Sequence, residues 1–157
     1  MLKVKIVCVG KVKEKYFEQG ILEYVKRISR FADIKIVEVA EENYKEVNAS
    51  IERQIKEKEA QRILPNLSGY VIACAIEGKK LSSTALAKTI ETKASLGLNE
   101  ITFVIGGSYG LCDSVKNKAQ MLLSLSDMTF PHTLFRLMLT EQVYRAFTII
   151  NNVKYHK

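Results

Sequence analysis

The sequence contains few of the residues that usually build disulfide-stabilised or metal-binding proteins. Its 157 residues include only three cysteines and two histidines. The cysteines, Cys8, Cys74 and Cys112, are odd in number and widely spaced, and two of them lie in apolar runs, so we expect free and mostly buried thiols. No paired cysteine motif accompanies His132 and His156, and a zinc site would have to be assembled from scattered ligands. We therefore expect no metal site.

Long apolar stretches are also absent. No run approaches the roughly 20 apolar residues that a membrane helix needs. The N-terminal sequence MLKVKIVCVG alternates apolar residues with lysine and does not have the apolar core of a signal peptide. No repeat, low-complexity segment or linker divides the chain, and its length suits one domain over residues 1–157. We expect a cytoplasmic protein that has no membrane segment.

Basic residues outnumber acidic ones. Lysine and arginine together number 24 against 17 acids, which gives a formal net charge of +7. Such a balance favours a polyanionic partner without identifying it. Five lysines fall within the first fifteen residues, beside the single acid Glu14: Lys3, Lys5, Lys11, Lys13 and Lys15. They predict a basic patch that attracts phosphates.

Short apolar runs alternate with segments of helical period along the whole chain. Strands are predicted at residues 2–9, 33–39, 70–76, 101–105 and 122–126. Helices are predicted at residues 14–31, at 50–64 with Ser50 as N-cap and Pro65 at the end, from Ser82 or Ser83 to Gly97, at 113–120 and at 133–150. The run YVIACAI is apolar throughout, as in a strand buried on both faces. This order predicts an α/β protein with a parallel sheet and right-handed crossovers.

Unusual residues follow three of the predicted strands, at 77–79, 106–110 and 126–132. In an open parallel sheet, ligands bind beyond the carboxyl ends of the strands, so we expect these segments to converge. The segment GGSYG at 106–110 does not match the dinucleotide pattern GxGxxG. Asp127 follows it by about twenty residues, but a dinucleotide fold requires an acid after the second strand, so the mismatch argues against NAD. Two interpretations stay open for GGSYG: a turn that needs glycine for its geometry, or a loop whose amides contact a ligand.

The segment DMTFPH has two interpretations as well. It is a proline turn between a strand and a helix, and its backbone at residues 125–130 can also surround an adenine or a thioether. His132 is either a surface residue at a helix start or a catalyst. A nucleophile pair of Cys112 and His132 lacks a recognisable oxyanion hole and a third orienting residue. No pair of carboxylates indicates glycoside hydrolysis.

Charged and polar residues interrupt the apolar surface of the last helix. Arg136, Glu141, Gln142 and Arg145 lie among Leu, Met, Val, Phe and Ile, and buried charges need partners, so we expect Glu141 to pair with the arginines. The tail YHK at 155–157 combines groups for stacking, proton transfer and phosphate binding, although chain ends often fray. Together with the glycine loop, these features predict an enzyme that binds phosphates and a base.

Several motifs in a fixed order resemble one family. FVIGGSYG, LSLSDMTFPH, EQVYRAF and the final YHK resemble the large-subunit ribosomal RNA methyltransferase H family, the small stand-alone members of the SPOUT superfamily. The opening VGKVKEKYFEQGILEYVKRI and the middle EKEAQRIL resemble it too, so the resemblance covers essentially the whole chain. It implies a single-domain parallel-sheet α/β fold with a C-terminal trefoil knot, the SPOUT α/β-knot. It also implies a homodimer whose site combines the knot of one subunit with the tail of the other.

The resemblance further implies an activity. The family transfers a methyl group from S-adenosyl-L-methionine to N3 of a pseudouridine in a stem-loop of 23S ribosomal RNA. The chain has no added RNA-binding module, so we expect it to recognise the assembled ribosome rather than a free hairpin. Two alternatives remain: a non-enzymatic RNA- or ribosome-binding module, and a methyltransferase of small molecules, which the basic charge disfavours.

The resemblance assigns roles to particular positions. Those that match the family's cofactor contacts are Cys74, Gly106, Gly107, Leu125, Ser126, Asp127, Met128, Thr129 and Phe130. Cys74 stands where the family usually has leucine, and the contact there is apolar. Arg145, Tyr155 and His156 match positions around the target base: Tyr155 can stack on it and Arg145 can stabilise its anion. His156, water and another group all remain candidates for the general base.

Overall fold

Five parallel strands form one sheet in the computed structural model, which describes residues 1–157. The strand order is β2-β1-β4-β3-β5, with bounds β1 Lys3–Val9, β2 Asp33–Val39, β3 Tyr70–Lys80, β4 Glu100–Ile105 and β5 Met121–Ser124. The helices are α1 Lys15–Ile28, α2 Ala49–Ile63, the short 3-10 helix η1 Leu64–Asn66, α3 Ser83–Ser95, α4 Asp113–Lys118 and α5 His132–Ile150. All neighbouring strands pair in parallel, which confirms the predicted parallel α/β sheet. No helix combines the length and the apolar character that a membrane crossing requires.

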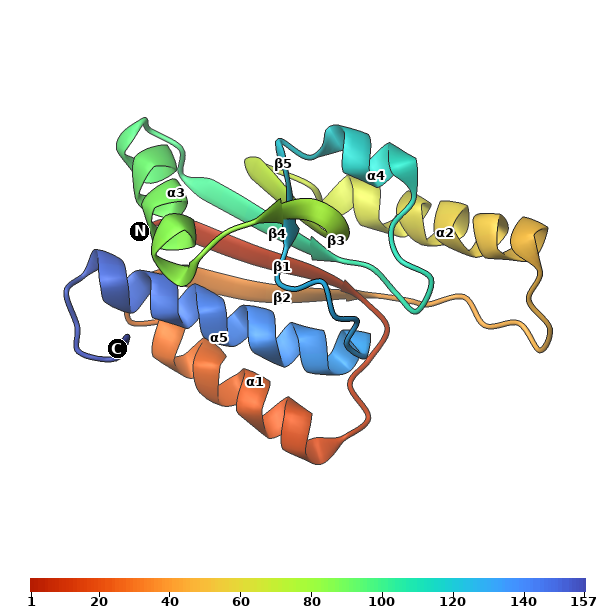
Figure 1. Cartoon of the computed structure of the whole chain (residues 1–157), viewed down its shortest axis with the longest axis horizontal. Helices are drawn as coiled ribbons and strands as arrows, with labels where there is room; N and C mark the ends of the chain where they lie inside the picture. Colours follow the sequence, from red (N-terminus) through yellow and green to blue (C-terminus); the bar gives the residue numbers. More distant parts are fainter.

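Helices cover both faces of the sheet (Figure 1). Helices α1, α3 and α5 pack on one face, and α2 and α4 on the other. The side chains of β1 alternate between these layers: Ile6 and Cys8 belong to the larger apolar cluster, and Val7 and Val9 to the smaller one. All four are almost fully buried, so both faces of an interior strand must be apolar. This explains why the strand predictions rest on continuous apolar runs.

The helices lie where they were predicted, with ends that differ by up to three residues: α1 ends at Ile28 and not at residue 31, and α4 at Lys118 and not at residue 120. Helix α2 begins after Asn48, whose side chain accepts a hydrogen bond from the Ile51 amide at 2.9 Å, so the predicted Ser50 cap is wrong. An asparagine oxygen satisfies the unpaired amides of a first turn as well as a serine hydroxyl does. Ser82 caps α3 through the Ala85 amide, and Gly97 follows this helix with φ +91°, as expected for a helix end.

Strand β3 differs most from its prediction, because it continues past residue 76 to Lys80. Its last part curls back over β5, so that Leu123 pairs with both Cys74 and Lys79. The two backbones touch at Gly78, where an added Cβ would lie 2.7 Å from the carbonyl carbon of Leu122. Only glycine permits this approach. The curl is visible around β5 in Figure 1 and is consistent with the trefoil knot, which itself stays a prediction.

A buried arginine connects α5 to the ends of the first two strands. Arg136 is only 3% exposed, and its guanidinium donates to a carboxylate oxygen of Glu38 at 2.5 Å and to the carbonyl of Gly10 at 3.1 Å. Glu141, the partner expected from sequence spacing, binds Arg145 instead. The true partner of Arg136 lies 98 residues away in the sequence, beyond the reach of local patterns.

The pairing predicts an asymmetric response to mutation. Glu38→Ala leaves a buried guanidinium without its counter-charge, and we expect it to lower the free energy of unfolding by about 2–3 kcal/mol. Arg136→Met removes the buried charge and keeps an apolar side chain of similar length, so we expect a loss of about 1 kcal/mol or less. Urea denaturation measures both. Glu57→Ala, on the exposed face of α2, is the control and should stay within about 0.5 kcal/mol of wild type. Equal losses for the Glu38 and Arg136 variants would contradict this account.

Candidate functional site

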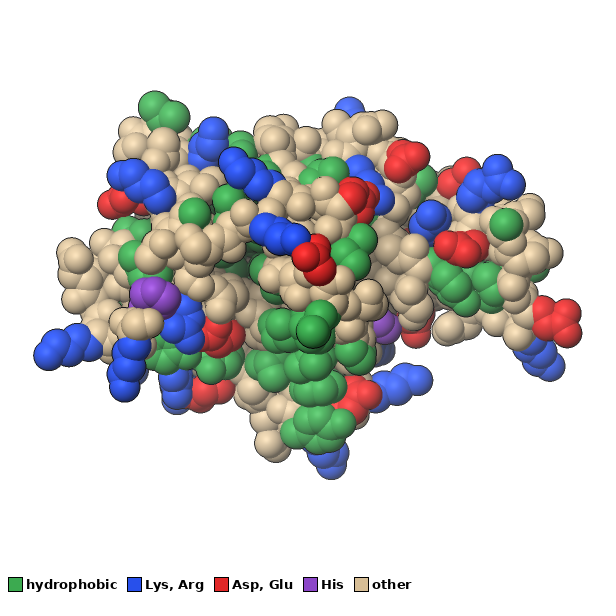
Figure 2. Space-filling model, in the orientation of Figure 1, with side chains coloured by type: hydrophobic (Ala, Val, Ile, Leu, Met, Phe, Trp, Pro, Cys, Tyr) green, Lys and Arg blue, Asp and Glu red, His purple; other side chains and the backbone are tan.

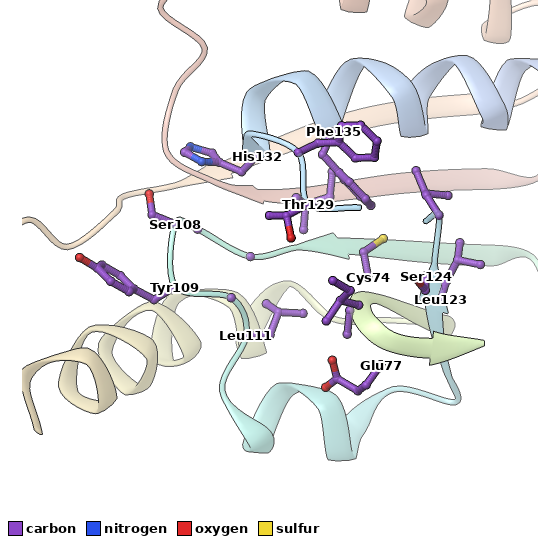
Figure 3. A pocket seen from close by; sticks show the side chains of 18 of the residues that line it. Cys74, Glu77, Ser108, Tyr109, Leu111, Leu123, Ser124, Thr129, His132 and Phe135 are labelled. Atoms are coloured by element: carbon purple, nitrogen blue, oxygen red, sulfur yellow. The ribbon is translucent and has the colours of Figure 1, made fainter. Parts of the chain in front are cut away.

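The main cavity of the molecule lies beyond the carboxyl ends of β4 and β5 and beside the bend in β3. It has a volume of about 760 Å³, within the range of roughly 300–1,000 Å³ that is usual for small-molecule sites. Figure 3 shows Cys74 and Thr129 facing the space below Phe135 of α5, with Ser108, Tyr109 and His132 together at one side. The three segments predicted to converge therefore meet around one cavity.

The glycine loop after β4 forms a tight turn at the edge of this cavity. The amide of Gly110 donates to the carbonyl of Gly107 at 3.0 Å, and Gly110 has φ +84°. An added Cβ on Gly106 would lie 2.8 Å from the Gly110 carbonyl carbon. The turn thus needs glycine for its geometry, and it also lines the cavity; contact between its amides and a ligand stays a prediction.

Most of the residues that match the family's cofactor contacts line this cavity. They are Cys74, Gly106, Gly107, Leu125, Ser126, Met128, Thr129 and Phe130. Asp127 does not line it: its side chain is 79% exposed and forms an ion pair with Lys80, on the curled end of β3. A contact from Asp127 to a ligand would have to come from its backbone.

Sequence reasoning missed part of the apolar lining of the cavity. Ile105, Leu111, Leu123 and Phe135 all line it and are mostly buried apolar residues that looked like ordinary core positions. In the sheet, β3 lies between β4 and β5. The sequence offers no signal for this order, because it is set by pairing between distant strands.

The cavity contains an apolar thiol and an ion pair. Burial raises the pKa of the Cys74 thiol, so it remains protonated and acts as an apolar contact rather than a nucleophile. Lys116 of α4 donates to Glu77 at 2.6 Å, and this hydrogen bond lowers the pKa of the Glu77 carboxyl. His132 lines the cavity but Cys112 does not, so the cavity does not bring together the nucleophile pair considered from the sequence. No group of three His, Cys, Asp or Glu side chains could hold a metal ion.

The residues assigned to the target base form a second cluster, at the C-terminal end of α5. The guanidinium of Arg145 binds one carboxylate oxygen of Glu141 through Nε at 3.0 Å and Nη2 at 2.5 Å. The Tyr155 hydroxyl donates to the same oxygen at 2.9 Å, and Arg145 lies 4.7 Å above the Tyr155 ring. Nη1 of Arg145 contacts Nδ1 of His156 at 3.2 Å. We call Glu141, Arg145, Tyr155 and His156 the tail cluster.

The tail folds back along α5 instead of fraying. Asn152 adopts φ +56°, and the Val153 amide donates to the Thr148 carbonyl at 2.9 Å, which reverses the chain. The Tyr155 ring then packs edge-on against Tyr144 at 4.7 Å. Burial and its hydrogen bonds to Tyr24 and Glu141 raise the pKa of the Tyr155 hydroxyl. The tail is therefore an ordered part of the molecule.

The cavity and the tail cluster lie at opposite ends of the same helix. His132 and Phe135 of the first turn line the cavity, whereas none of the tail cluster does. Thirteen residues separate His132 from Arg145, which corresponds to about 20 Å along a helix axis at 1.5 Å per residue. Figure 1 shows the C-terminus beside the far end of α5. Within one chain, the two clusters therefore cannot contact the same nucleobase.

The lysines of the predicted N-terminal basic patch lie in two separate places. Lys3 lies at the start of β1, and Lys11, Lys13 and Lys15 follow its end, so a strand about 20 Å long separates them. Lys5 is largely neutralised by contacts with Glu100 at 3.2 Å and with the Ser68 hydroxyl at 2.8 Å. Exposed lysines are thus present at both ends of the strand, rather than in one patch.

Comparison with known proteins places the chain in a family. A family model described as "Predicted SPOUT methyltransferase" matches residues 2–156. The chain is 49% identical over 159 residues to a protein of Streptococcus uberis and 50% identical to one of Lactobacillus johnsonii, both named "Ribosomal RNA large subunit methyltransferase H". Each match covers 99% of this chain and 100% of the relative.

The fold agrees with these matches. A solved structure from Haemophilus influenzae, described as a "probable methylase family protein", aligns with a TM-score of 0.53 at 14% identity. The alignment covers 98% of this chain and 70% of that one. At this identity the likeness concerns the fold alone, and the family assignment rests on the full-length sequence matches. The chain belongs to the SPOUT methyltransferase family.

Proposed function

We propose that this chain methylates 23S ribosomal RNA, at N3 of a pseudouridine in a stem-loop of the assembled large subunit. One observation carries the proposal. The chain is about 49% identical to relatives named for ribosomal RNA methylation, and the match extends over their whole length. The net charge of +7 suits a polyanionic substrate. A cavity of about 760 Å³ favours an enzyme over a module that only binds RNA.

S-adenosyl-L-methionine is the proposed methyl donor, and the main cavity fits it. Apolar side chains such as Leu125 and Phe130 suit an adenine and a thioether, and Gly106 also lines the cavity. When bound, the donor supplies a methyl group activated by a sulfonium. The protein then has to hold that group in line with the target nitrogen and keep other nucleophiles away. The protonated Cys74 thiol offers no competing thiolate there.

The active unit is proposed to be a homodimer in which each site combines one subunit's cavity with the other's tail cluster. The separation of about 20 Å between the two clusters on α5 is the main support, because one chain cannot close that gap. Exposed apolar side chains add to it: Tyr16 and Leu22 of α1 and Met128 are 59–73% exposed. Figure 2 shows apolar side chains gathered in a column over this side of α1 and the segment leading to α5. Such a surface is typical of an interface.

Direct transfer tests the activity. Purified protein is incubated with labelled S-adenosylmethionine and ribosomes from cells that lack the gene for this protein. We expect one methyl group per 23S RNA, at a pseudouridine, and little transfer to naked RNA. Absence of label in ribosomes, or label in ribosomal protein, would contradict the proposal.

Gly106→Val tests the donor site. The new side chain meets the Gly110 backbone and distorts the turn that lines the cavity, so we expect binding of S-adenosylmethionine to weaken by at least about tenfold in calorimetry. The control is Gly97→Ala. Gly97 has φ +91°, so this substitution also strains the backbone, but the residue does not line the cavity and donor binding should not change. Unchanged binding in the folded Gly106 variant would show that the donor binds elsewhere.

A mixed dimer tests the shared site. Two tags on co-expressed chains allow purification of the dimer that pairs Gly106→Val with His156→Ala. Each variant alone should be inactive, but the mixed dimer keeps one intact cavity opposite one intact tail. We expect about half of the wild-type activity per dimer, since one of its two symmetric sites is intact. An inactive mixed dimer would mean that cavity and tail act within one chain, and an active His156→Ala homodimer would mean that this tail residue is not needed.

A further inference from the structure

The tail cluster is organised around the carboxylate of Glu141. One of its oxygens accepts three hydrogen bonds, two from Arg145 and one from the Tyr155 hydroxyl, and the other accepts from Gln142 Nε2 at 2.9 Å. Its side chain is only 17% exposed. With both oxygens engaged in this way, Glu141 holds the Arg145 guanidinium in one orientation.

Contacts of Tyr155 with Glu141, Tyr24 and Arg145 also support the orientation of the Arg145 guanidinium. The Tyr155 hydroxyl gives its proton to Glu141, so in its 3.4 Å contact with Tyr24 of α1 it can only accept. The Tyr155 ring lies under the guanidinium of Arg145. The hydrogen bonds to Glu141 raise the pKa of Arg145 further, so this group is always a cation and a donor.

The contact between Arg145 and His156 then determines where the imidazole carries its proton. A guanidinium has donors only, so the ring nitrogen that faces Arg145 must offer a lone pair. That nitrogen is Nδ1, at 3.2 Å from Nη1. In a neutral imidazole the other nitrogen, Nε2, consequently bears the hydrogen. A ring turned over about the Cβ–Cγ bond would place the carbon Cδ2 toward Arg145 and lose this contact, so the hydrogen bond also fixes the orientation of the ring.

We propose that His156 acts on the target base as a hydrogen-bond donor, not as the general base, and that Glu141 is the residue that positions it through Arg145. This inference rests on the proposed function and deepens it. The outward N–H has no lone pair to accept a proton. The lone pair of Nδ1 is already directed at the Arg145 donor, so neither nitrogen of the ring offers the base a free lone pair.

The role of a donor follows from the chemistry of the target. The imide hydrogen of N3 leaves to a water molecule, and the negative charge spreads to the two carbonyl oxygens beside N3. The N3 electron pair then forms a bond to the methyl carbon, while the carbon–sulfur bond breaks and sulfur keeps its electrons. Hydrogen bonds to a carbonyl oxygen from His156, with the positive charge of Arg145 beside it, stabilise the anion before transfer.

A spectroscopic test does not depend on activity. Two-bond ¹H–¹⁵N correlation spectra of the full-length protein distinguish a protonated from an unprotonated ring nitrogen, and His132 is the only other histidine. His156→Gln identifies the signals of His156. We expect a proton on Nε2 and none on Nδ1 in the neutral ring, and altered His156 signals in Arg145→Met and Glu141→Gln. A proton on Nδ1, or signals that neither variant alters, would overturn the proposal.

A pair of variants of similar size provides the kinetic test. His156→Gln retains an N–H donor near the position of Nε2 but cannot act as a base, whereas His156→Met retains neither function. At saturating ribosomes we expect kcat of the Gln variant within about tenfold of wild type, and that of the Met variant lower by about 10²-fold or more, as for loss of an oxyanion donor. Equal and large losses of kcat in the Gln and Met variants would identify His156 as a base and overturn its role as a donor. If wild-type protein methylates no ribosome, the proposed function fails, and the spectra alone decide on the tautomer.

Discussion

The close contact between the end of β3 and β5 is the constraint on which the rest of the site depends. Because Gly78 has no side chain, the β3 backbone can lie against Leu122 and Leu123 and pair with β5 a second time after a bend. The bend exposes the residues from Cys74 to Glu77 to the cavity, and the segment after β5 closes the opposite side. A side chain at position 78 would separate the two backbones and open the cavity.

The last helix determines how the function can be distributed in space. Helix α5 is anchored at its start by the buried Arg136, which joins it to Glu38 and to the turn at Gly10. Its first turn lines the cavity and its last turns hold the tail cluster. Because a helix is stiff, the distance between those ends cannot vary, and a site that needs both must draw on two chains. The proposed activity then requires a dimer, because only two chains together can complete the site, whether or not dimerisation also stabilises the fold.

The tail illustrates how a short segment at a chain end can carry precise chemistry. Residues beyond a helix usually lose order because they bury little surface. Here Tyr155 packs against Tyr144 and binds Glu141, and this contact keeps Arg145 and His156 in register. A stacking platform for the target base was one role predicted for Tyr155. One side of its ring is occupied by Arg145, which favours a supporting role for it in this arrangement.

The sequence by itself determined the order and kind of the elements, because apolar runs and helical periods are local properties that burial in a parallel sheet imposes on each segment. The motifs GGSYG and LSLSDMTFPH were also enough to identify most residues around the cavity, since ligands gather at the carboxyl ends of strands. Tertiary structure alone decided the position of β3 between β4 and β5, its bend around β5, the pairing of Arg136 with Glu38, and the distance between the cavity and the tail cluster. Each of these features depends on contacts between segments that are far apart in the chain. Packing and the need to neutralise buried charge determine which segments pair, and local residue spacing carries no information about that pairing.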